Sequence, residues 1–527
     1  MAERFSYYAI AGNLIQYLTK EFGEPVVAAA KHINIWLGVS SLFPILGGLI
    51  ADSYLGRFNT ILISTFIFLL GLVLLTLSVA TVPLHIRPAV FYSSLYIFSI
   101  GEGGHKPCVQ TFAADQFDED SEEEKKKKST FFNWWYAGIV VGSSTAVLVA
   151  VYLQDNVSWT VGFSLPTVVV ALALVVFLLG TRGYCRSVLV GSPFTKVAQV
   201  FVAAARKRHL SENLDGGDVC QGQGEAKIRS LARNNQFSFL DKATIIDAED
   251  ASSKTRNNWR LCSVNQVEET KLILRLVPIW FSVLPFSVIN AQHGTFFTKQ
   301  GNSLDRSLTS KFAIPAASLQ FFTGVTILIS LIIYDRLFVQ LMRKLTGHPS
   351  GITMLQRIGV GIFTSTICMV IAALVEAKRV SVALEHGLIN NPKATLPMSV
   401  FWLLPQYMLL GVSDVFAIIG MQELFYTQVH EDMRSIGAAA FLTVTGIGNF
   451  LSTAVITIVQ LISSKLGNQW LGYNLNQAHL HGFYLVLAAM CALSLCMFVW
   501  FSKGFIYKEL KSEDAGEDRD SLEEGKL

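Results

Sequence analysis

The chain has 527 residues, of which 51% are hydrophobic and only 15% are charged. With a mean hydropathy of +0.44, it has too few polar residues to cover a soluble surface, and a net charge of +3 is too small to suggest binding to nucleic acid. The composition therefore predicts an integral membrane protein and excludes a soluble domain or a nucleic-acid-binding protein.

The cysteines show no spacing typical of disulfides or of a metal site. They lie in apolar segments or basic loops, at positions 108, 185, 220, 262, 368, 491 and 496. No nucleophile, metal cluster or phosphate-binding loop suggests a membrane enzyme. We therefore expect free thiols, no cofactor and no metal.

Apolar segments follow one another along the chain, and a window of about 19 residues predicts twelve membrane-spanning helices. The predicted spans are residues 1–20, 31–51, 60–82, 89–112, 131–153, 159–180, 268–290, 312–334, 352–375, 397–423, 436–462 and 480–502. An even number of spans places both termini on one side. Lys and Arg are concentrated in alternate loops, which puts the termini and the long central loop in the cytoplasm.

The central loop is polar and rich in glycine, which is typical of a linker. We expect an N-terminal six-helix bundle, this loop, a C-terminal six-helix bundle and an acidic cytoplasmic tail, over residues 1–180, 181–265, 266–503 and 504–527. The tail is expected to be disordered. The lysine run 125–128 is expected to anchor its loop at lipid headgroups.

The first predicted span carries two charges almost at its start. Glu3 and Arg4 stand in MAERFSYYAIAGNLIQYL, a segment that is otherwise largely apolar and aromatic. An ionisable side chain at membrane depth costs roughly 2.5–3.5 kcal/mol, so such residues usually move an ion or hold a substrate. A span needs about 20 apolar residues, which predicts that this first helix is truncated. The alternative is a pair at a helix end that frays into the cytoplasm.

The second and eighth predicted spans end in similar charged segments. GGLIADSYLGR ends the second span, and LIIYDRLFVQLMRKLTG ends the eighth. Two six-span bundles with matching acidic and basic ends resemble the major facilitator superfamily. The resemblance assigns close helix approach and tight turning to Gly48 and Gly56. It assigns a gating latch between neighbouring helices to Asp52 and Arg57, next to the turn at Gly56. Ordinary interfacial charge is the alternative.

The longest motif is FYSSLYIFSIGEGGHKPCVQTFAADQFDE, residues 91–119. Further motifs are FFNWWYAG, GSPFTKVAQVFVAA and VEETKLILRLVPIWF. Together they resemble the plant nitrate transporter 1/peptide transporter family, within the proton-dependent oligopeptide transporter group. The resemblance extends from Glu3 to about Tyr507. It implies a major facilitator fold and proton-coupled transport.

Lys106 lies deep in the fourth predicted span and needs an anion there. We identified Glu423 as the only acid at comparable depth in the second half, and the family pattern places the two opposite each other across a central cavity. A salt bridge between them would close a gate in one conformation; a static buried pair is the alternative. Glu102 and His105 were expected to point to other faces of the helix, in lipid-headgroup or interhelical contacts.

In the family, the first span carries Glu-x-x-Glu-Arg followed by aromatic residues. The second half of this pattern is matched here by Glu3, Arg4, Phe5, Tyr7 and Tyr8. The first Glu has no counterpart, because its position falls just before Met1. The resemblance assigns proton coupling to Glu3 and Arg4 and a substrate surface to Tyr7 and Tyr8.

The seventh span and the fifth span bear on the substrate. Asn290, Ala291 and Gln292 stand where nitrate carriers of the family have a histidine before Ala-Gln, and an amide can still donate hydrogen bonds to nitrate or an organic solute. Val140 stands where peptide carriers have an asparagine. His293 was expected on another face, near the extracellular mouth. We therefore predict that Lys106, Asn290, Gln292 and Glu423 contribute to binding.

Thr60 matches a threonine that is phosphorylated in the family, which implies a regulatory kinase. The alternative is a threonine that satisfies backbone donors at a helix N-terminus.

The sequence thus predicts a proton-coupled symporter of nitrate or another small solute, in the plasma membrane or the vacuolar membrane. Its partners would be the solute, protons and the lipid bilayer. A carrier of di- and tripeptides or of plant metabolites and hormones is the first alternative. The second is a solute sensor with impaired transport.

Overall fold

The computed structural model describes most of the chain. The described residues are 1–114, 116–117, 138–184, 193–209, 236–247, 257–309, 312–347, 351–392, 394–429, 434–467, 470–472 and 474–507. The lysine run 125–128 and residues 508–527 of the acidic tail lie outside this set. The chain forms two compact units, one of Met1–Gly191, Phe281–Glu423 and Ala439–Trp500 and the other of Ser192–Trp280, Leu424–Ala438 and Phe501–Leu527.

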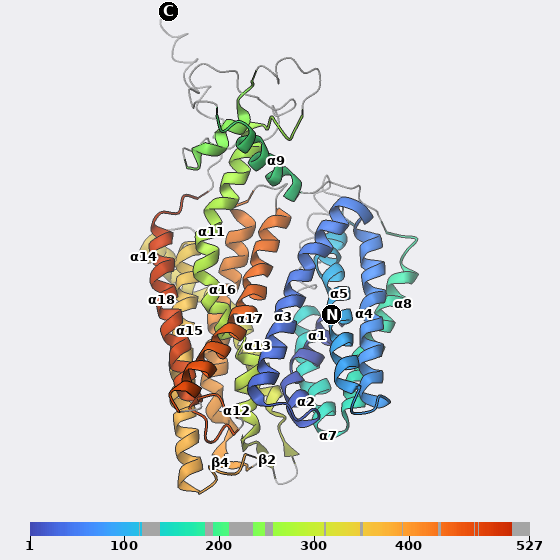
Figure 1. Cartoon of the computed structure of the whole chain (residues 1–527), viewed down its shortest axis with the longest axis vertical. Coiled ribbons are helices and arrows are strands. Elements are labelled where there is room, and N and C mark those ends of the chain that lie inside the picture. Colours follow the sequence, from blue (N-terminus) through green and yellow to red (C-terminus); the bar gives the residue numbers. More distant parts are fainter. Residues whose placement is uncertain are drawn as a thin grey trace, which may run out of the picture. The chain divides into compact units, whose positions relative to one another are not determined.

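The N-terminal part of the first unit is helical (Figure 1). Its elements are α1 (Ala2–Ala11), α2 (Leu14–Lys20), α3 (Val26–Ile50), the π-helical turn η1 (Ala51–Leu55), α4 (Arg57–Ala80), α5 (Arg87–Ala114), η2 (Ala146–Ala150), α7 (Val151–Asn156) and α8 (Trp159–Leu179). Helix α5 packs against α3 and α4, and α8 packs against α4 (Figure 1). Gly47 of α3 lies against the backbone of Gly103 in α5, where a Cβ atom would clash. This close approach sets the position of the charged residues on α5.

The C-terminal half is also largely helical. Its elements are α11 (Val264–Asn290), η5 (His293–Phe297), α12 (Thr298–Asn302), η6 (Ala316–Leu319), α13 (Gln320–Ile333), η7 (Tyr334–Phe338), α14 (Val339–Thr346), α15 (Met354–Glu385), η8 (Val400–Leu403), α16 (Leu404–Thr427), α17 (Arg434–Lys465) and α18 (Leu480–Lys503). Helix α15 begins with a capping box in which the Thr353 and Gln356 side chains each bond the other's backbone. The first turns of α11 and parts of α16 and α17 belong to the second unit.

The sequence echo between the second and eighth spans has a structural counterpart. The acid of each segment lies in a π-helical turn, Asp52 in η1 and Asp335 in η7. Gly56 ends the first of these turns with a φ of 75°, a conformation that favours glycine. The tight turn predicted at Gly56 is thus confirmed.

Short strands interrupt the expected all-α fold. Strand β1 (Leu304–Asp305) pairs in parallel with β4 (Leu396–Ser399), and β2 (Ser307–Thr309) pairs antiparallel with β3 (Phe312–Ala313). The predicted starts of the eighth and tenth spans at 312 and 397 were therefore wrong. Pro315 disfavours helix in the residue before it, and residues 397–399 belong to strand β4. Hydropathy averaging registers neither feature.

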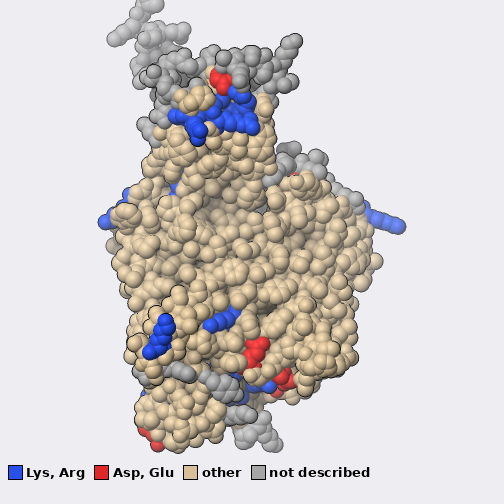
Figure 2. Space-filling model, in the orientation of Figure 1, with Lys and Arg blue, Asp and Glu red and all other residues tan. Residues whose placement is uncertain are grey.

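Ten helices of the described residues are long and apolar enough to cross a membrane. The first and fourth predicted spans are not among them. Helices α1 and α2 have 10 and 7 residues, whereas α5 has 28 residues and is made more polar by Glu102, His105 and Lys106. At 1.5 Å per residue α5 is about 42 Å long, enough for the hydrocarbon core. The count of twelve stays a prediction, and so does a truncated first span. Figure 2 shows a wide surface almost free of charged side chains, as lipid contact requires.

The second unit corrects the expectation that the central loop is only a linker. Helix α9 (Pro193–Arg206) and the 3₁₀ turn η4 (Ser238–Thr244) pack on the start of α11. Their shared apolar core consists of Val200, Ala203, Ala204, Leu240, Ala243, Cys262 and Val267. Buried Lys271 lies 2.7 Å from Asp241 and 2.8 Å from Glu268. Helix α9 folds here because its apolar residues recur at helical spacing, and η4 packs with it on the same core.

A buried ion pair stabilises the C-terminal half. Arg379 donates two hydrogen bonds to Glu376, of 2.8 Å from Nε and 2.7 Å from Nη2, and both side chains are fully buried. Its Nη1 donates to Asn476 over 2.6 Å. Gln300 donates to the Glu376 carboxylate over 2.6 Å. The network joins α15 to α12 and to the chain before α18.

We expect Arg379→Met to destabilise the protein strongly, because it leaves the Glu376 carboxylate buried without its cation. Breaking such a pair costs about 3–5 kcal/mol. The exposed Lys378 is the matched control: its Nζ lies 4.0 Å from the Trp402 ring centroid, a contact worth about 0.5–1 kcal/mol. The melting temperature in detergent should fall much further for Arg379→Met than for Lys378→Met. Equal shifts would contradict the assignment.

Candidate substrate and proton site

Helices α1 and α5 bring several of the predicted site residues into one cluster. Arg4 Nε lies 2.8 Å from Glu3 Oε2, and Lys106 Nζ lies 3.4 Å from Glu102 Oε1. The ring of Tyr7 lies beside both cations, with its centroid 5.8 Å from Arg4 Cζ and 5.6 Å from Lys106 Nζ. The predicted proton-coupling pair and the predicted substrate lysine thus contact the same aromatic ring.

Glu102 corrects an expectation. It was placed on a different face from Lys106, but residues four apart share one face of a helix, and the two form an ion pair. Glu102 is completely buried. The motif that contains Lys106 thus supplies its anion as well.

The cluster contains two carboxylates and two cations. Glu3 Oε1 and Glu102 Oε2 are buried and have no hydrogen-bond partner among the described residues. A buried oxygen without a partner is costly unless it is protonated or bonded to a ligand or water. Each carboxylate therefore keeps one position at which a proton or a solute donor can bind.

In the C-terminal half, Asn290 donates a hydrogen bond of 2.7 Å to Asp414 in α16. Asp414 is not among the predicted site residues, and the prediction that Glu423 is the only acid at comparable depth in the second half is wrong. The signal was available: Asp414 is an acid within the apolar segment GVSDVFAIIG. Tyr8 lies on α1, and its ring centroid is 5.3 Å from that of Tyr7.

Glu423 and Lys106 do not form the predicted bridge in this conformation. Glu423 Oε2 lies 3.2 Å from Arg357 Nη1, while Lys106 pairs with Glu102. Arg357 also donates to the carbonyl of Val415 over 3.0 Å. Each predicted gate residue is therefore paired within its own half, and a bridge in another conformation stays a prediction. Arg357 is not among the predicted site residues, although it is a cation near the start of a predicted span.

Gln292 lies in a buried network that joins the two halves. Its Nε2 donates to Ser452 Oγ over 3.1 Å, and Asn34 Nδ2 donates to the same oxygen over 3.0 Å. These residues are buried, and the Gln292 side chain is fully enclosed. Gln292 thus contacts α17, and through Ser452 it is linked to α3. Its role as a substrate ligand stays a prediction. Neighbouring His293 lies 3.1 Å from the hydroxyl of Thr323.

More polar contacts between the halves lie at the predicted outer ends of the spans. Lys299 donates to Thr19 over 2.7 Å, and Gln320 donates to the carbonyl of Gly12 over 2.9 Å. Lys31 donates to Gln460 over 2.8 Å. The halves are therefore joined at their outer ends in this conformation.

The predicted cytoplasmic latch residues also lie together. Arg57 Nε is 3.7 Å from Asp52 Oδ1, across the turn at Gly56. Thr60 is buried, and its hydroxyl donates to the Gly56 carbonyl over 2.9 Å. A kinase would need the start of α4 to open before it could reach this hydroxyl. Phosphorylation of Thr60 stays a prediction.

Comparison with known proteins decides the family. The model of the family described as PTR2, POT family, matches residues 58–471, which is most of the chain. The chain belongs to the POT family.

Relatives of this POT family member come from Arabidopsis thaliana. The chain is 54% identical over 523 residues to Protein NRT1/ PTR FAMILY 5.4, covering 98% of this chain and 94% of the relative. It is 45% identical over 526 residues to Protein NRT1/ PTR FAMILY 5.10, covering 97% and 92%. The resemblance inferred from the motifs is confirmed, and the chain is a multi-pass membrane protein of a transporter family.

Solved structures show the same fold. An auto inhibited POT family peptide transporter matches with a TM-score of 0.72 and 19% identity, over 97% of this chain and 96% of that chain. A POT family transporter in complex with 5-aminolevulinic acid matches with a TM-score of 0.65 and 15% identity, over 96% and 94%. The expected major facilitator architecture is thereby confirmed.

Proposed function

We propose that this POT family member is a proton-coupled symporter of nitrate or another small solute that works by alternating access. The observation that supports this is the α1 and α5 cluster, in which two acid–base pairs meet at Tyr7 inside the helical bundle. Charged groups so placed serve proton or solute movement far more often than packing. Family membership supports the same proposal.

In the proposed cycle, a proton binds the free oxygen of Glu3 and weakens its pairing with Arg4. The anionic part of the solute then takes the carboxylate's place beside Arg4 and Lys106. Tyr8 contributes a polar group from α1, and Asn290 contributes one from α11 in the C-terminal half. Release of the proton restores the Glu3–Arg4 pair and expels the solute, which couples the two fluxes.

The contacts at the predicted outer ends support an assignment of this conformation as closed to the outside. The opposite conformation requires Lys299 to leave Thr19 of α2 and Gln320 to leave Gly12, the residue that follows α1. We propose that the Lys106–Glu423 bridge forms in that second conformation, after each residue leaves its present partner. We also propose that both termini are cytoplasmic and that the solute is imported. The protein would reside in the plasma membrane or the vacuolar membrane.

Uptake by proteoliposomes tests this function. With an inward proton gradient, the protein should accumulate one member of a panel of nitrate, dipeptides and plant metabolites, and Glu3→Gln should abolish the dependence on the gradient. Glu385→Gln, at an exposed position near the end of α15, is the control and should leave uptake unchanged. Binding without accumulation would instead support a sensor. Gradient-driven uptake that persists in Glu3→Gln would contradict the proposed coupling.

A further inference from the structure

The first predicted span is broken into two short helices. Helix α1 ends at Ala11, and α2 begins at Leu14. Between them the backbone of Asn13 leaves the helical region, with φ of −121° and ψ of 8°. The N–H of Gln16 bonds the carbonyl of Asn13 over 3.0 Å, whereas in a continuous helix it would bond the carbonyl of Gly12, four residues earlier. The break therefore frees the Gly12 carbonyl.

A side chain from the C-terminal half bonds this free carbonyl. Gly12 and Gln320 are both buried, and Nε2 of Gln320 donates to the Gly12 carbonyl over 2.9 Å. The same nitrogen donates to the hydroxyl of Thr298 over 3.1 Å. Gln320 begins α13, and Thr298 begins α12. Contact between the halves thus supplies the donor that a buried backbone carbonyl needs.

Two further contacts hold the break from within the N-terminal half. Gln154 of α7 donates to the carbonyl of Ala9 over 2.7 Å, and Nδ2 of Asn13 donates to Asp155 over 3.4 Å. These partners stay with α1 when the halves separate, because they belong to the same half. Of the three contacts, only the one from Gln320 is lost in that movement.

We propose that Gln320 couples closure of the outer side to the break in the first span. When the outer side opens, the Gly12 carbonyl loses Gln320 and accepts the N–H of Gln16 instead, so that residues 2–20 form one helix. Such a helix is about 28 Å long, close to the ~30 Å of the hydrocarbon core.

Gln320 is a positioning residue in this scheme. Glu3 and Arg4 lie on α1, so a change in the direction of α1 against α2 moves the proposed proton site whenever the outer side opens or closes. The inference rests on the alternating access proposed above. It adds the residue through which the outer contacts act on the first helix.

Labelling of a cysteine between the halves tests the coupling in lipid nanodiscs, without any solute. Ala317 of η6 is fully buried, and η6 packs on α7 and η2 of the N-terminal half. Ala317→Cys therefore reacts with a maleimide only when the outer side opens. The reporter protein carries serine in place of the cysteines at positions 185, 220 and 496.

Gln320→Leu should raise the rate of this labelling at least about tenfold, which corresponds to ~1.4 kcal/mol. The variant keeps the volume of the side chain but leaves the buried Gly12 carbonyl without its donor, which disfavours the closed conformation. Buried Cys368 and Cys491 are the internal control for folding. They should stay unlabelled, because general unfolding would expose them together with the reporter.

Asn13→Ala separates the coupling from a simple contact between the halves. Alanine favours helix more than asparagine, so this variant favours the continuous helix, in which Gln16 displaces Gln320 from the Gly12 carbonyl. Because linkage is reciprocal, the labelling rate should rise about threefold. Asp155→Ala removes the same side-chain bond of Asn13 but keeps Asn13, and it should label like the reporter protein.

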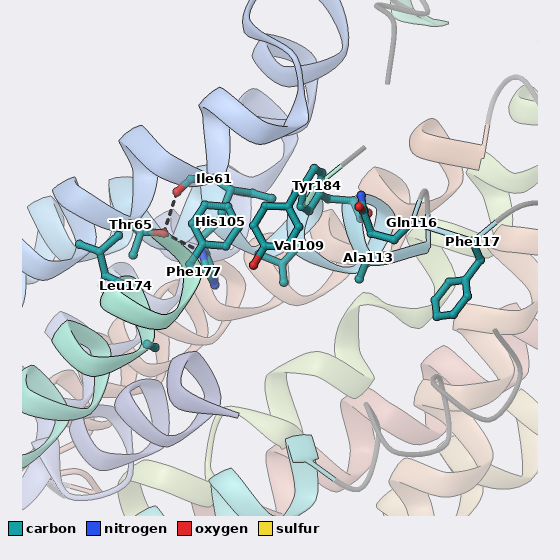
Figure 3. A pocket seen from close by; sticks show the side chains of 12 residues that line it. Ile61, Thr65, His105, Val109, Ala113, Gln116, Phe117, Leu174, Phe177 and Tyr184 are labelled. Carbon is teal, nitrogen blue, oxygen red and sulfur yellow. Dashed lines mark hydrogen bonds between the residues drawn. The ribbon is translucent and has the colours of Figure 1, made fainter. Parts of the chain in front are cut away.

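A cavity of about 400 Å³ within the N-terminal half provides a control for changes in packing (Figure 3). Its walls belong to α4, α5 and α8 with Tyr184, and no residue of the break lines it. Ala173→Val at this wall should leave the labelling rate unchanged.

Two results would overturn the inference. Unchanged labelling in Gln320→Leu would show that Gln320 does not hold the outer side closed. A rate that rises in Gln320→Leu but not in Asn13→Ala would show that closure and the break are independent. Failure of the proposed transport function appears separately, as a lack of gradient-driven uptake by the natural protein.

Discussion

Uptake by a Lys106→Ala variant should fall at least about tenfold, a loss of ~1.4 kcal/mol or more in transition-state stabilisation. Lys106 is the cation paired with fully buried Glu102, and its ammonium lies beside Tyr7. Without it, Glu102 has to bind a proton or remain an uncompensated buried charge. The cluster would then hold two carboxylates but only one cation throughout the cycle. Initial rates of solute uptake in proteoliposomes measure the effect.

A second variant separates the transport role of Lys106 from simple neutralisation of Glu102. In the double variant Lys106→Ala with Glu102→Ala, both members of the pair are absent, so the melting temperature in detergent should recover towards that of the natural protein. Uptake should stay low, because the solute lacks its cation. If uptake recovers together with stability, Lys106 serves only to compensate Glu102, and its assignment as a substrate residue is wrong.

An Asp414→Asn variant should lose most of the stimulation of uptake by external acid. Asp414 accepts a hydrogen bond of 2.7 Å from Asn290, and asparagine retains an oxygen that can accept the same bond. The substitution therefore removes the titratable charge and leaves the geometry in place. We propose that Asp414 exchanges a second proton during the cycle, in addition to the proton on Glu3, so that its replacement flattens the pH profile.

The measurement is the ratio of initial uptake rates at acidic and neutral external pH, which should approach one in Asp414→Asn. Glu423→Gln is the comparison: it weakens the pair with Arg357 but leaves Asp414 intact, so acid stimulation should persist. An unchanged ratio in Asp414→Asn would show that Asp414 has a structural role and would leave proton coupling to Glu3 and Glu102.

Local properties of the sequence predicted much of this protein. Composition indicated a membrane protein, hydropathy located the spans, and the motif around Lys106 indicated the family, which the family comparison confirms. These predictions succeed because hydropathy and motifs depend on residues that are close together in the chain. The same locality explains the two span starts that were wrong, where window averaging carried one helix across Pro315 and the other into strand β4.

Several site features were within reach of the sequence and were missed. The pairing of Glu102 with Lys106 follows from their spacing of four residues on a helix. Asp414 is an acid in an apolar span, and the rule that singled out Lys106 applies to it equally. Both features depend only on the local sequence, on a spacing of four residues in one case and on a single charge in an apolar segment in the other.

The sequence by itself determined the class and the family. Only the tertiary structure decided which charges pair, because an ion pair between helices depends on the rotation and packing of both. Glu423 pairs with Arg357 of α15, and Gln292 meets Ser452 of α17, which also binds Asn34 of α3. These partners are separated by tens to hundreds of residues, and close contacts such as that of Gly47 with Gly103 set the distances between their helices. Packing of this kind is a property of the whole bundle, which no local pattern contains.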